Sequence, residues 1–373
     1  MNNDVKLFGS LYGLNDAWVS WLKGEKFPIA FYGDSTVDGN NTTGWIGNKL
    51  GADSTSPNAF SEKLEIKLRE AANNSILRIY NAGFSGQISS WALANYDNVF
   101  GETSAYNDVK MVGIGFGIND RLVYQDEKSY RDGFKNNIKG IIGKCYASNI
   151  QPFLITTQAT VEPGVRTDFT TRYPLRTSQH INTIANEVKK ELSIEYGLEL
   201  LDINSYTEDF LLYSSYSLET IISDRLHFND VGHEYEAGLL FALINPQTIF
   251  ADGFHKIDYS NQRIAKGVPE DWLTMPTAVK DNFKVYIDYT KSDMADMNIM
   301  TVYVFNKSKR KLNLKAYKNH ETTKTYVKID GEVKSLTGVE TDLGELELGL
   351  HKFEVFTGTS NIADFKGFLL VML

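Results

Sequence analysis

Two short stretches of the sequence carry the side chains that an ester-cleaving serine needs. GDS (33–35) places a serine directly after an apolar run, and DRLH (224–227) places a carboxylate three residues before a histidine. A serine hydroxyl is a poor nucleophile without a base, and His227 can supply that base. Asp224 can fix the tautomer of the histidine and stabilise the imidazolium that forms. These residue types predict acyl transfer, with Ser35 attacking a carbonyl and His227 protonating the leaving alcohol.

Two further stretches offer hydrogen-bond donors for the oxyanion that such an attack creates. NAGFSG ends at Gly86, and GFGIND contains Asn119. The backbone N–H groups of Ser35 and Gly86 and the side-chain amide of Asn119 can together donate three hydrogen bonds. A glycine suits position 86 because the backbone can approach the substrate closely there, although Gly83 in the same stretch is a rival.

Each of the four stretches has a more ordinary interpretation when it is taken alone. A Gly-Asp-Ser is more often a turn, an Asp-x-x-His is usually a surface pair, and an asparagine shortly after a glycine is commonly a cap or turn residue. The joint pattern favours function, because all four stretches fall at the ends of expected strands or in loops on the same rim.

Alternating strands and helices are expected between residues 27 and 245, and they would bring the four stretches together. Apolar runs predict strands at 27–33, 75–83, 109–117, 150–158 and 198–204. Apolar residues on one face predict helices at about 58–72, 127–148, 178–197 and 229–244. Strands separated by helices imply an α/β fold, a parallel sheet with helices on both faces. The carboxyl ends of its strands share one rim, where open α/β sheets bind ligands.

The hydrophobic pattern changes after about residue 250. Short segments of alternating polarity, separated by turn residues, predict an antiparallel β-sandwich. The expected organisation is an N-terminal extension (1–26), a catalytic domain (27–248), a connector (249–275) and a C-terminal all-β sandwich as an accessory domain (276–373). The N-terminal extension contains one expected short helix, NDAWVSWLKG.

The four stretches resemble the motif blocks of the SGNH hydrolase family, the GDSL-type esterases and lipases. The matching residues are GDS (33–35), the glycine of FSG (84–86), GIND (117–120) and DRLH (224–227). The resemblance covers about residues 27–245 and implies a three-layer, flavodoxin-like fold with a five-stranded parallel sheet. One departure is Thr36, which stands where the leucine of the GDSL motif would be.

The resemblance, carried over residue by residue, implies a role for each matching position. Ser35 would be the nucleophile, and Asp224 with His227 would complete its catalytic triad. Gly86 and Asn119 would donate hydrogen bonds to the oxyanion. The resemblance thereby assigns the same roles that the residue types suggest.

Several residues beside the motifs are interpreted as supporting residues. Asp34 and Asp120 are expected to hold the rim rigid through hydrogen bonds. His233, six residues past the predicted base, is expected to be a helix-surface or supporting residue rather than a metal ligand. Trp45 and Trp91 are either core residues or an apolar or sugar-stacking wall beside the site.

The composition limits the classes of partner and cofactor. The 373 residues carry a net charge of −9, which argues against nucleic acid or an anionic membrane as the main partner. Cys145 is the single cysteine, so a disulfide within the chain and a cysteine-based zinc site are excluded, and no cofactor or metal is expected. The apolar end, FKGFLLVML, is too short to span a bilayer. No signal peptide is visible at the start, which leaves the localisation open.

The expected activity is that of a serine esterase acting on an O-acetyl ester of a carbohydrate. Loops at 161–176 and 205–220 are rich in Tyr, Arg and Thr, which suits a sugar-like substrate better than a long acyl chain. The β-domain would bind carbohydrate or mediate assembly, for example as a homo-oligomer. Two alternatives stay open: a lipase or lysophospholipase, and a glycan-binding phage or surface adhesin that carries an esterase domain.

Overall fold

The computed structural model divides the chain into two compact units. The first unit comprises Met1–Leu212 and Tyr216–Ile244, and the second comprises Tyr213–Ser215 and Asn245–Leu373. The structure describes residues 12–50, 53, 56–124, 126–160, 178–213, 218–222, 224, 226–245, 248–251, 255–258, 284–286, 298–306, 312–318, 321, 324–357, 362–365 and 367–372. Each unit is therefore considered by itself.

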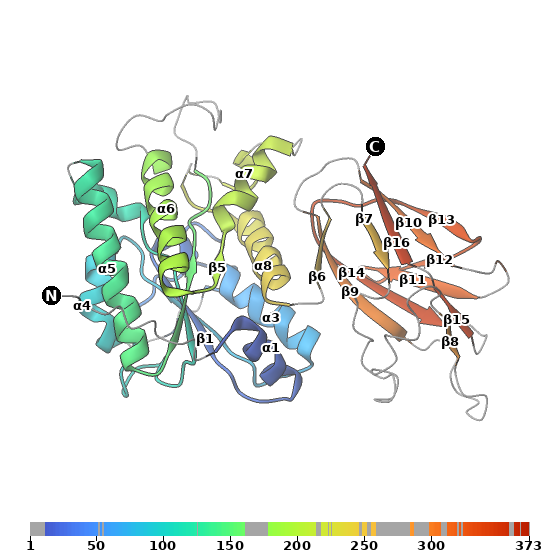
Figure 1. Ribbon diagram of the computed structural model, residues 1–373, viewed down its shortest axis with the longest axis horizontal. Coiled ribbons are helices and arrows are strands. Elements are labelled where there is room, and N and C mark those ends of the chain that lie inside the picture. Colours follow the sequence, from blue (N-terminus) through green and yellow to red (C-terminus); the bar gives the residue numbers. More distant parts are fainter. Residues whose placement is uncertain are drawn as a thin grey trace. The chain divides into compact units, whose positions relative to one another are not determined.

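The first unit is built on a five-stranded parallel sheet (Figure 1). Its strands, in chain order, are β1 (Ile29–Gly33), β2 (Ile79–Gly83), β3 (Met111–Ile114), β4 (Gln151–Ile155) and β5 (Leu200–Leu201). They pair in the order β2-β1-β3-β4-β5, and all four pairings are parallel. The α/β fold and the five-stranded sheet expected from the sequence are confirmed, with β1 next to the centre.

Helices cover both faces of this sheet and complete three layers (Figure 1). One face carries α4 (Ser89–Phe100), α5 (Glu127–Ala147) and α6 (Ser178–Tyr196), and the other carries α1 (Leu14–Leu22), α3 (Phe60–Ala72) and α8 (Asp230–Ile244). The remaining helices are α2 (Ser35–Asp38), α7 (Ile203–Tyr213), and two 3-10 turns, η1 (Ile118–Leu122) and η2 (Leu218–Thr220). The sequence predicts α3, α5, α6 and α8 to within a few residues.

Two of the longer helices, α4 and α7, are not among the helices expected from the sequence. Residues 205–220 are expected to form a loop, but they are helical as far as Tyr213. Ile203, Thr207 and Phe210 are fully buried at helical spacing, and the hydroxyl-rich residues between them obscure this pattern in the sequence. The other expected loop, 161–176, lies outside the described residues.

Strand β1 is buried on both faces, which fixes the residues that follow it. Three phenylalanine rings pack edge-to-face around Tyr32, with centroids 4.8 to 6.2 Å away: Phe84, Phe100 and Phe116. Its neighbour Phe31 points to the opposite face, where it packs edge-to-face against Phe60 and Phe153. Successive side chains of a strand alternate between faces, so two aromatic clusters hold the strand from both sides.

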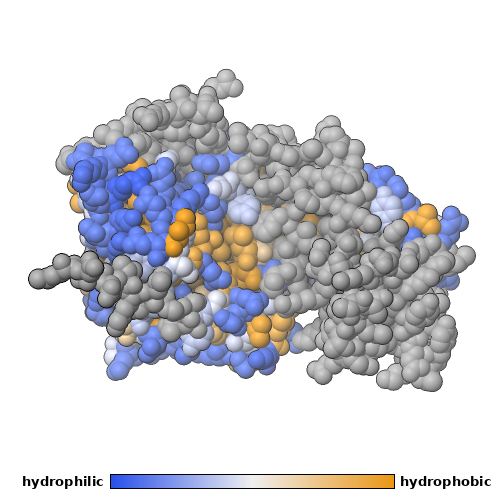
Figure 2. Space-filling model, viewed as in Figure 1, coloured by the Kyte–Doolittle hydropathy of each residue, from blue (hydrophilic) through white to orange (hydrophobic). Residues whose placement is uncertain are grey.

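The outward surfaces of α5 and α6 are polar (Figure 2). Three basic residues of α5 form ion pairs with three glutamates of α6: Arg131, Lys135 and Lys139 with Glu187, Glu191 and Glu195. Exposed ion pairs of this kind contribute little to stability individually. They link the outward faces of α5 and α6 to each other. Among the described residues, no helix is long and apolar enough to cross a membrane.

The described residues of the second unit form β-sheets in which every strand pairing but one is antiparallel. Its five-stranded sheet has the order β12-β11-β14-β9-β6, and its four-stranded sheet has the order β13-β10-β16-β7. The strands are β6 (Thr248–Ala251), β7 (His255–Asp258), β8 (Lys284–Tyr286), β9 (Asn298–Asn306), β10 (Leu312–Tyr317), β11 (Thr325–Ile329), β12 (Glu332–Ser335), β13 (Glu340–Glu345), β14 (Gly349–Thr357), β15 (Ile362–Asp364) and β16 (Gly367–Met372). The exception is the parallel pair of β6 and β9.

The two larger sheets of this unit pack face to face. Phe353 of β14 and Phe368 of β16 belong to different sheets, and their ring centroids lie 4.9 Å apart. Strands β6 and β7 lie in or next to the range expected to be a connector, 249–275, yet each pairs within one of these sheets. This part of the chain therefore contributes strands to the second unit.

Candidate active site

Ser35 follows β1 through a tight turn from strand to helix. Gly33 ends the strand, and Ser35 begins α2. A Cβ atom at Gly33 would lie 2.2 Å from Cγ2 of Val37, so only glycine allows the helix to start this close to the strand. The Asp34 carboxylate caps the helix by accepting hydrogen bonds from the backbone N–H and the hydroxyl of Thr36, at 3.0 and 2.9 Å.

The structure brings Ser35, His227 and Asp224 together in one chain of hydrogen bonds. His227 Nε2 lies 2.8 Å from Ser35 Oγ, and His227 Nδ1 lies 2.6 Å from Asp224 Oδ2. Burial of Asp224 raises its pKa, but hydrogen bonds from His227 outweigh this effect and hold the pKa below its ordinary value. The carboxylate is therefore ionised at neutral pH and favours the His227 tautomer with a proton on Nδ1. In that tautomer, Nε2 is free to accept a proton from the serine.

The segment that presents His227 is held by a residue that the sequence does not single out. The Asn229 side chain donates to the carbonyl of Thr220 at 3.1 Å and accepts from the N–H groups of Val231 and Gly232 at 3.0 Å. The N–H of Asn229 also bonds to the carbonyl of Ile221 at 2.9 Å. One asparagine thus caps α8 and closes the turn before it, which leaves His227 little freedom to move.

The structure distinguishes the two glycines proposed as oxyanion donors. The N–H of Gly83 is bonded to Oδ1 of Asn81 at 3.1 Å, and a Cβ atom there would lie 2.2 Å from the backbone N of Asp38. Gly86 has a φ of +78°, and no described residue accepts a hydrogen bond from its N–H. Gly83 is therefore a close-packing position, whereas Gly86 keeps a backbone N–H available to a ligand.

Asn119 lies beside the same loop. It belongs to η1, which follows β3, and it is 7% exposed. One hydrogen of its amide is donated to the carbonyl of Gln87 at 3.1 Å, which orients the side chain toward the residue after Gly86. Since an amide nitrogen carries two hydrogens, one remains for a further acceptor.

A buried group of charges lies beneath these loops. Asp120 accepts hydrogen bonds from the N–H and the hydroxyl of Ser89, which ties η1 to the start of α4. Burial raises the pKa of Asp120 to about 6 and also raises that of Asp34. Lys189 of α6 is fully buried, and burial lowers its pKa to about 8 against the attraction of both aspartates. Lys189 is not among the residues singled out from the sequence, although its position on the apolar face of α6 could have indicated it.

The remaining candidates separate into core and surface residues. Trp91 packs against Phe84, with ring centroids 5.1 Å apart, whereas Trp45 is 36% exposed. Of the two roles expected for His233, the structure excludes the position at the helix surface: His233 is 1% exposed and accepts a hydrogen bond from the N–H of Phe60 at 3.2 Å. Burial lowers the pKa of His233 to about 3, so it is neutral. Within the part of the chain that the structure describes, no cluster of three or more His, Cys, Asp or Glu could hold a metal.

The parallel sheet and the hydrogen-bonded serine, histidine and aspartate at one rim have the architecture of an α/β serine hydrolase. The model of the GDSL-like lipase/acylhydrolase family matches residues 31–235, which is more than half of the chain. The protein therefore belongs to this family and is a carboxylic ester hydrolase. The resemblance inferred from the four motif blocks is confirmed.

Several solved structures are similar to this chain at low sequence identity. Residues of this chain align with Axe2, an acetylxylan esterase from Geobacillus stearothermophilus, at 18% identity and a TM-score of 0.45, covering 59% of this chain and 94% of Axe2. A two-domain esterase (CEX) active on acetylated mannans aligns at 16% identity and a TM-score of 0.46, covering 98% of this chain and 94% of that one. LAE5, an α/β hydrolase from the metagenome of Lake Arreo, Spain, aligns at 19% identity and a TM-score of 0.45, covering 58% and 94%. No curated protein matches in sequence.

Proposed function

We propose that the protein hydrolyses esters through a covalent acyl-enzyme formed on Ser35. The observation that supports this proposal is the 2.8 Å hydrogen bond between Ser35 Oγ and His227 Nε2, with Asp224 on the other ring nitrogen. In the first step His227 takes the proton of Ser35 while Oγ bonds to the ester carbonyl carbon. The resulting imidazolium lies 2.6 Å from the Asp224 carboxylate, which stabilises its charge.

The tetrahedral intermediate then collapses to the acyl-enzyme, and water hydrolyses the acyl-enzyme in a second step. His227 gives its proton to the leaving alcohol, and the C–O bond of the ester breaks to leave the acyl group on Ser35. A water molecule next gives a proton to His227 as it attacks the acyl carbon, and the serine is released with the same proton. We infer that the N–H groups of Ser35 and Gly86 and the amide of Asn119 stabilise the oxyanion in both steps.

The proposed substrate is an O-acetyl ester on a carbohydrate. The loop after α2 supports this choice, because Asn41, Thr43 and the partly exposed ring of Trp45 present polar groups and an aromatic face together. Sugars expose hydroxyl groups at their edges and C–H groups on their faces, so this combination suits them. The loop starts next to the nucleophile, since the N–H of Asn40 bonds to the carbonyl of Ser35 at 3.2 Å.

A lipase or lysophospholipase activity is the second candidate, and a different observation favours it. Ile46 and Leu50 in the same loop are 58% and 48% exposed, so the loop also presents aliphatic side chains that could contact an acyl chain. Rates with p-nitrophenyl esters of increasing acyl length separate the two candidates. A maximum at acetate supports the acetyl esterase, and a maximum at about eight carbons or longer, where a longer chain buries more apolar surface, supports the lipase.

The direct experiment measures the release of acetate from acetylated xylo- and manno-oligosaccharides, with the Ser35→Ala protein as the control. These are the substrate types named for the two acetyl esterases of similar structure. Release by the wild type and its loss in the variant are expected. Equal release by both proteins would reject Ser35 as the nucleophile, whereas no release by either would reject the acetylated glycan as the substrate.

A further inference from the structure

One buried carboxylate connects three loops of the first unit. Asp38 is the last residue of α2, one turn after Ser35, and it is fully buried. Its Oδ2 accepts hydrogen bonds from the Ser85 hydroxyl at 2.5 Å and from Nε1 of Trp45 at 3.2 Å. Its Oδ1 accepts a hydrogen bond from the backbone N–H of Asn48 at 3.3 Å. None of these three donors is part of the proposed chemistry.

Each donor belongs to a segment that borders the proposed site. Ser85 directly precedes Gly86, the proposed oxyanion donor. The hydrogen bond from the Ser85 hydroxyl to Asp38 therefore anchors the loop that carries Gly86. Trp45 is the tryptophan that is 36% exposed in the loop after α2. Ser85 and Trp45 donate to the same oxygen atom, so Oδ2 of Asp38 connects the indole N–H directly to the oxyanion loop.

The surrounding structure leaves Asp38 no room to shift. A Cβ atom at Gly83 would lie 2.2 Å from the backbone N of Asp38, so β2 and the end of α2 are in direct contact. The Asn81 side chain also donates to the carbonyl of Asp38 at 3.4 Å. Asp38 is therefore held by β2 and by Asn81 while it accepts hydrogen bonds from Ser85 and Trp45.

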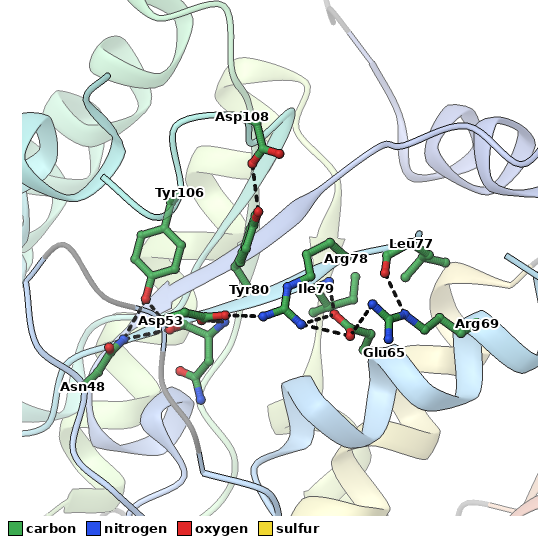
Figure 3. A network of polar contacts seen from close by, with 11 residues as sticks. Asn48, Asp53, Glu65, Arg69, Leu77, Arg78, Ile79, Tyr80, Tyr106 and Asp108 are labelled. Atoms are coloured by element: carbon green, nitrogen blue, oxygen red, sulfur yellow. Dashed lines mark hydrogen bonds and ion pairs between the residues drawn. The ribbon is translucent and has the colours of Figure 1, made fainter. Parts of the chain in front are cut away.

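The far part of the Trp45 loop is held separately. Asn48 donates to the carbonyl of Asn81 at 2.7 Å and to the hydroxyl of Tyr106 at 3.0 Å (Figure 3). Asp53 accepts from Arg78 at 2.6 Å and from the N–H of Asn81 at 3.2 Å (Figure 3). These contacts fix the loop on β2, and the indole N–H adds its own hydrogen bond to Asp38.

We propose that Asp38 is a positioning residue that aligns the oxyanion loop with an aromatic platform at Trp45, and that this platform binds the sugar ring of the ester. Through Ser85 it sets the position of the Gly86 N–H, and through Nε1 it holds the indole so that its exposed ring faces the substrate. A sugar ring on Trp45 then brings its acetyl carbonyl to the oxyanion donors. The inference rests on the proposed function of Ser35, whose substrate it specifies.

The bonding at Asp38 predicts the effect of an isosteric change. An indole N–H and a backbone N–H can only donate, so both carboxyl oxygens must accept. In Asp38→Asn, an NH₂ group replaces one oxygen and faces a donor, either at Asn48 or at Trp45. The variant Asp38→Asn/Trp45→Phe removes the conflict on the Oδ2 side, where the new NH₂ group can donate to the Ser85 hydroxyl instead.

The experiment measures kcat and KM with two substrates, ethyl acetate and an acetylated xylo-oligosaccharide. Ethyl acetate offers no ring to Trp45, so it reports only on the oxyanion loop. We expect Ser85→Ala and Asp38→Asn to lower kcat roughly tenfold with ethyl acetate, because a displaced donor loses transition-state stabilisation, and KM to stay within about twofold. We expect Trp45→Ala to raise KM for the oligosaccharide roughly tenfold, and to change KM for ethyl acetate much less, because ethyl acetate has no sugar ring.

Two controls separate positioning from folding. Asp108 also accepts a hydrogen bond from a hydroxyl, that of Tyr80 at 3.0 Å (Figure 3). It comes just before the amino end of β3, away from the rim at the carboxyl ends of the strands, so Asp108→Asn should leave kcat unchanged. Ser85→Thr retains the hydroxyl and should keep kcat near the wild-type value. Recovery of kcat in Asp38→Asn/Trp45→Phe would support the bonding scheme, and equal loss in the single and double variants would contradict it.

A readout without turnover distinguishes failure of this inference from failure of the proposed function. The indole N–H resonance of Trp45, assigned with Trp45→Phe, should shift in Ser85→Ala because both donors share Oδ2, and should not shift in Asp108→Asn. If the wild type hydrolyses neither substrate, the proposed function has failed, and this resonance still tests the coupling. If the wild type is active but Ser85→Ala keeps full kcat and the resonance does not move, the positioning role is overturned.

Discussion

The hydrogen bonds of Asp224 predict that asparagine is a worse replacement than alanine. Oδ1 of Asp224 accepts from the N–H groups of Leu226 and His227 at 3.0 and 2.7 Å, and Oδ2 faces Nδ1 of His227 at 2.6 Å. In Asp224→Asn, the amide oxygen keeps the two backbone bonds and its NH₂ group faces Nδ1. The imidazole must then accept at Nδ1 and carry its proton on Nε2, where it cannot accept the proton of Ser35.

The expected loss of kcat depends on how accessible the site of the Asp224 carboxylate is to water. Loss of the correct tautomer and of the counter-charge should lower kcat on the order of 10³-fold at pH 7 in Asp224→Asn. The Asp224 side chain is 42% exposed, so in Asp224→Ala water can enter and accept from Nδ1. We therefore expect Asp224→Ala to retain roughly tenfold more activity than Asp224→Asn.

The assay is the hydrolysis of a small acetyl ester by both variants, with circular dichroism to verify folding. Asp230→Asn is the matched control, because Asp230 accepts a backbone hydrogen bond from Thr43 at 2.8 Å without contacting the histidine. An Asp224→Asn protein that folds and keeps kcat within tenfold of the wild type would refute the assigned role of the carboxylate. An alanine variant less active than the asparagine variant would refute the tautomer argument.

Three further predictions concern the loops and the core. Asn119→Ala should lower kcat roughly 10²- to 10³-fold with little change in KM, as steady-state kinetics would show, because it removes an oxyanion donor. In Gly86→Ala the new Cβ atom meets no atom within 4 Å but the residue must adopt a φ of +78°, so we expect a lower kcat and a melting temperature only a few degrees lower. In Gly83→Ala the new Cβ atom would clash at 2.2 Å, so this variant should not fold stably. His233 is neutral in the folded state, with its pKa lowered from 6.5 to about 3, so its stabilising contribution is present above pH 6.5 and is lost as the pH falls toward 3. Urea unfolding of His233→Leu should show a loss of about 2 kcal/mol at pH 7.5, from the unpaired N–H of Phe60, and a smaller loss at pH 5; an equal loss at both values would contradict the assignment.

The sequence contains most of the information that places the four motif blocks. Apolar runs that end in Gly33, Gly83 and Gly117 mark where buried parallel strands reach the rim, because both faces of such strands are covered. The expected order of strand and helix is therefore reproduced. The spacing of Asp224 and His227 on one turn also predicts their mutual hydrogen bond, since the two residues are local in the chain.

The contacts between distant segments could not be predicted in the same way. Nothing in the local sequence shows that Ser85 and Trp45, 40 residues apart, meet on one oxygen of Asp38. His233 and Lys189 are polar residues on apolar helix faces, and composition alone favours placing such residues in solvent. Their burial depends on the three-dimensional neighbours, the N–H of Phe60 for His233 and the rim aspartates for Lys189.

The most direct test of the account is the detection of an acyl-enzyme on the proposed nucleophile. The wild-type protein is mixed with p-nitrophenyl acetate, quenched with acid within the first turnover, and examined by mass spectrometry of the intact chain and of its peptides. Nucleophilic attack by Ser35 predicts one added acetyl group on the peptide that contains Ser35, and no such adduct in Ser35→Ala. An acetyl group on a different residue, or hydrolysis by Ser35→Ala at the wild-type rate, would contradict it.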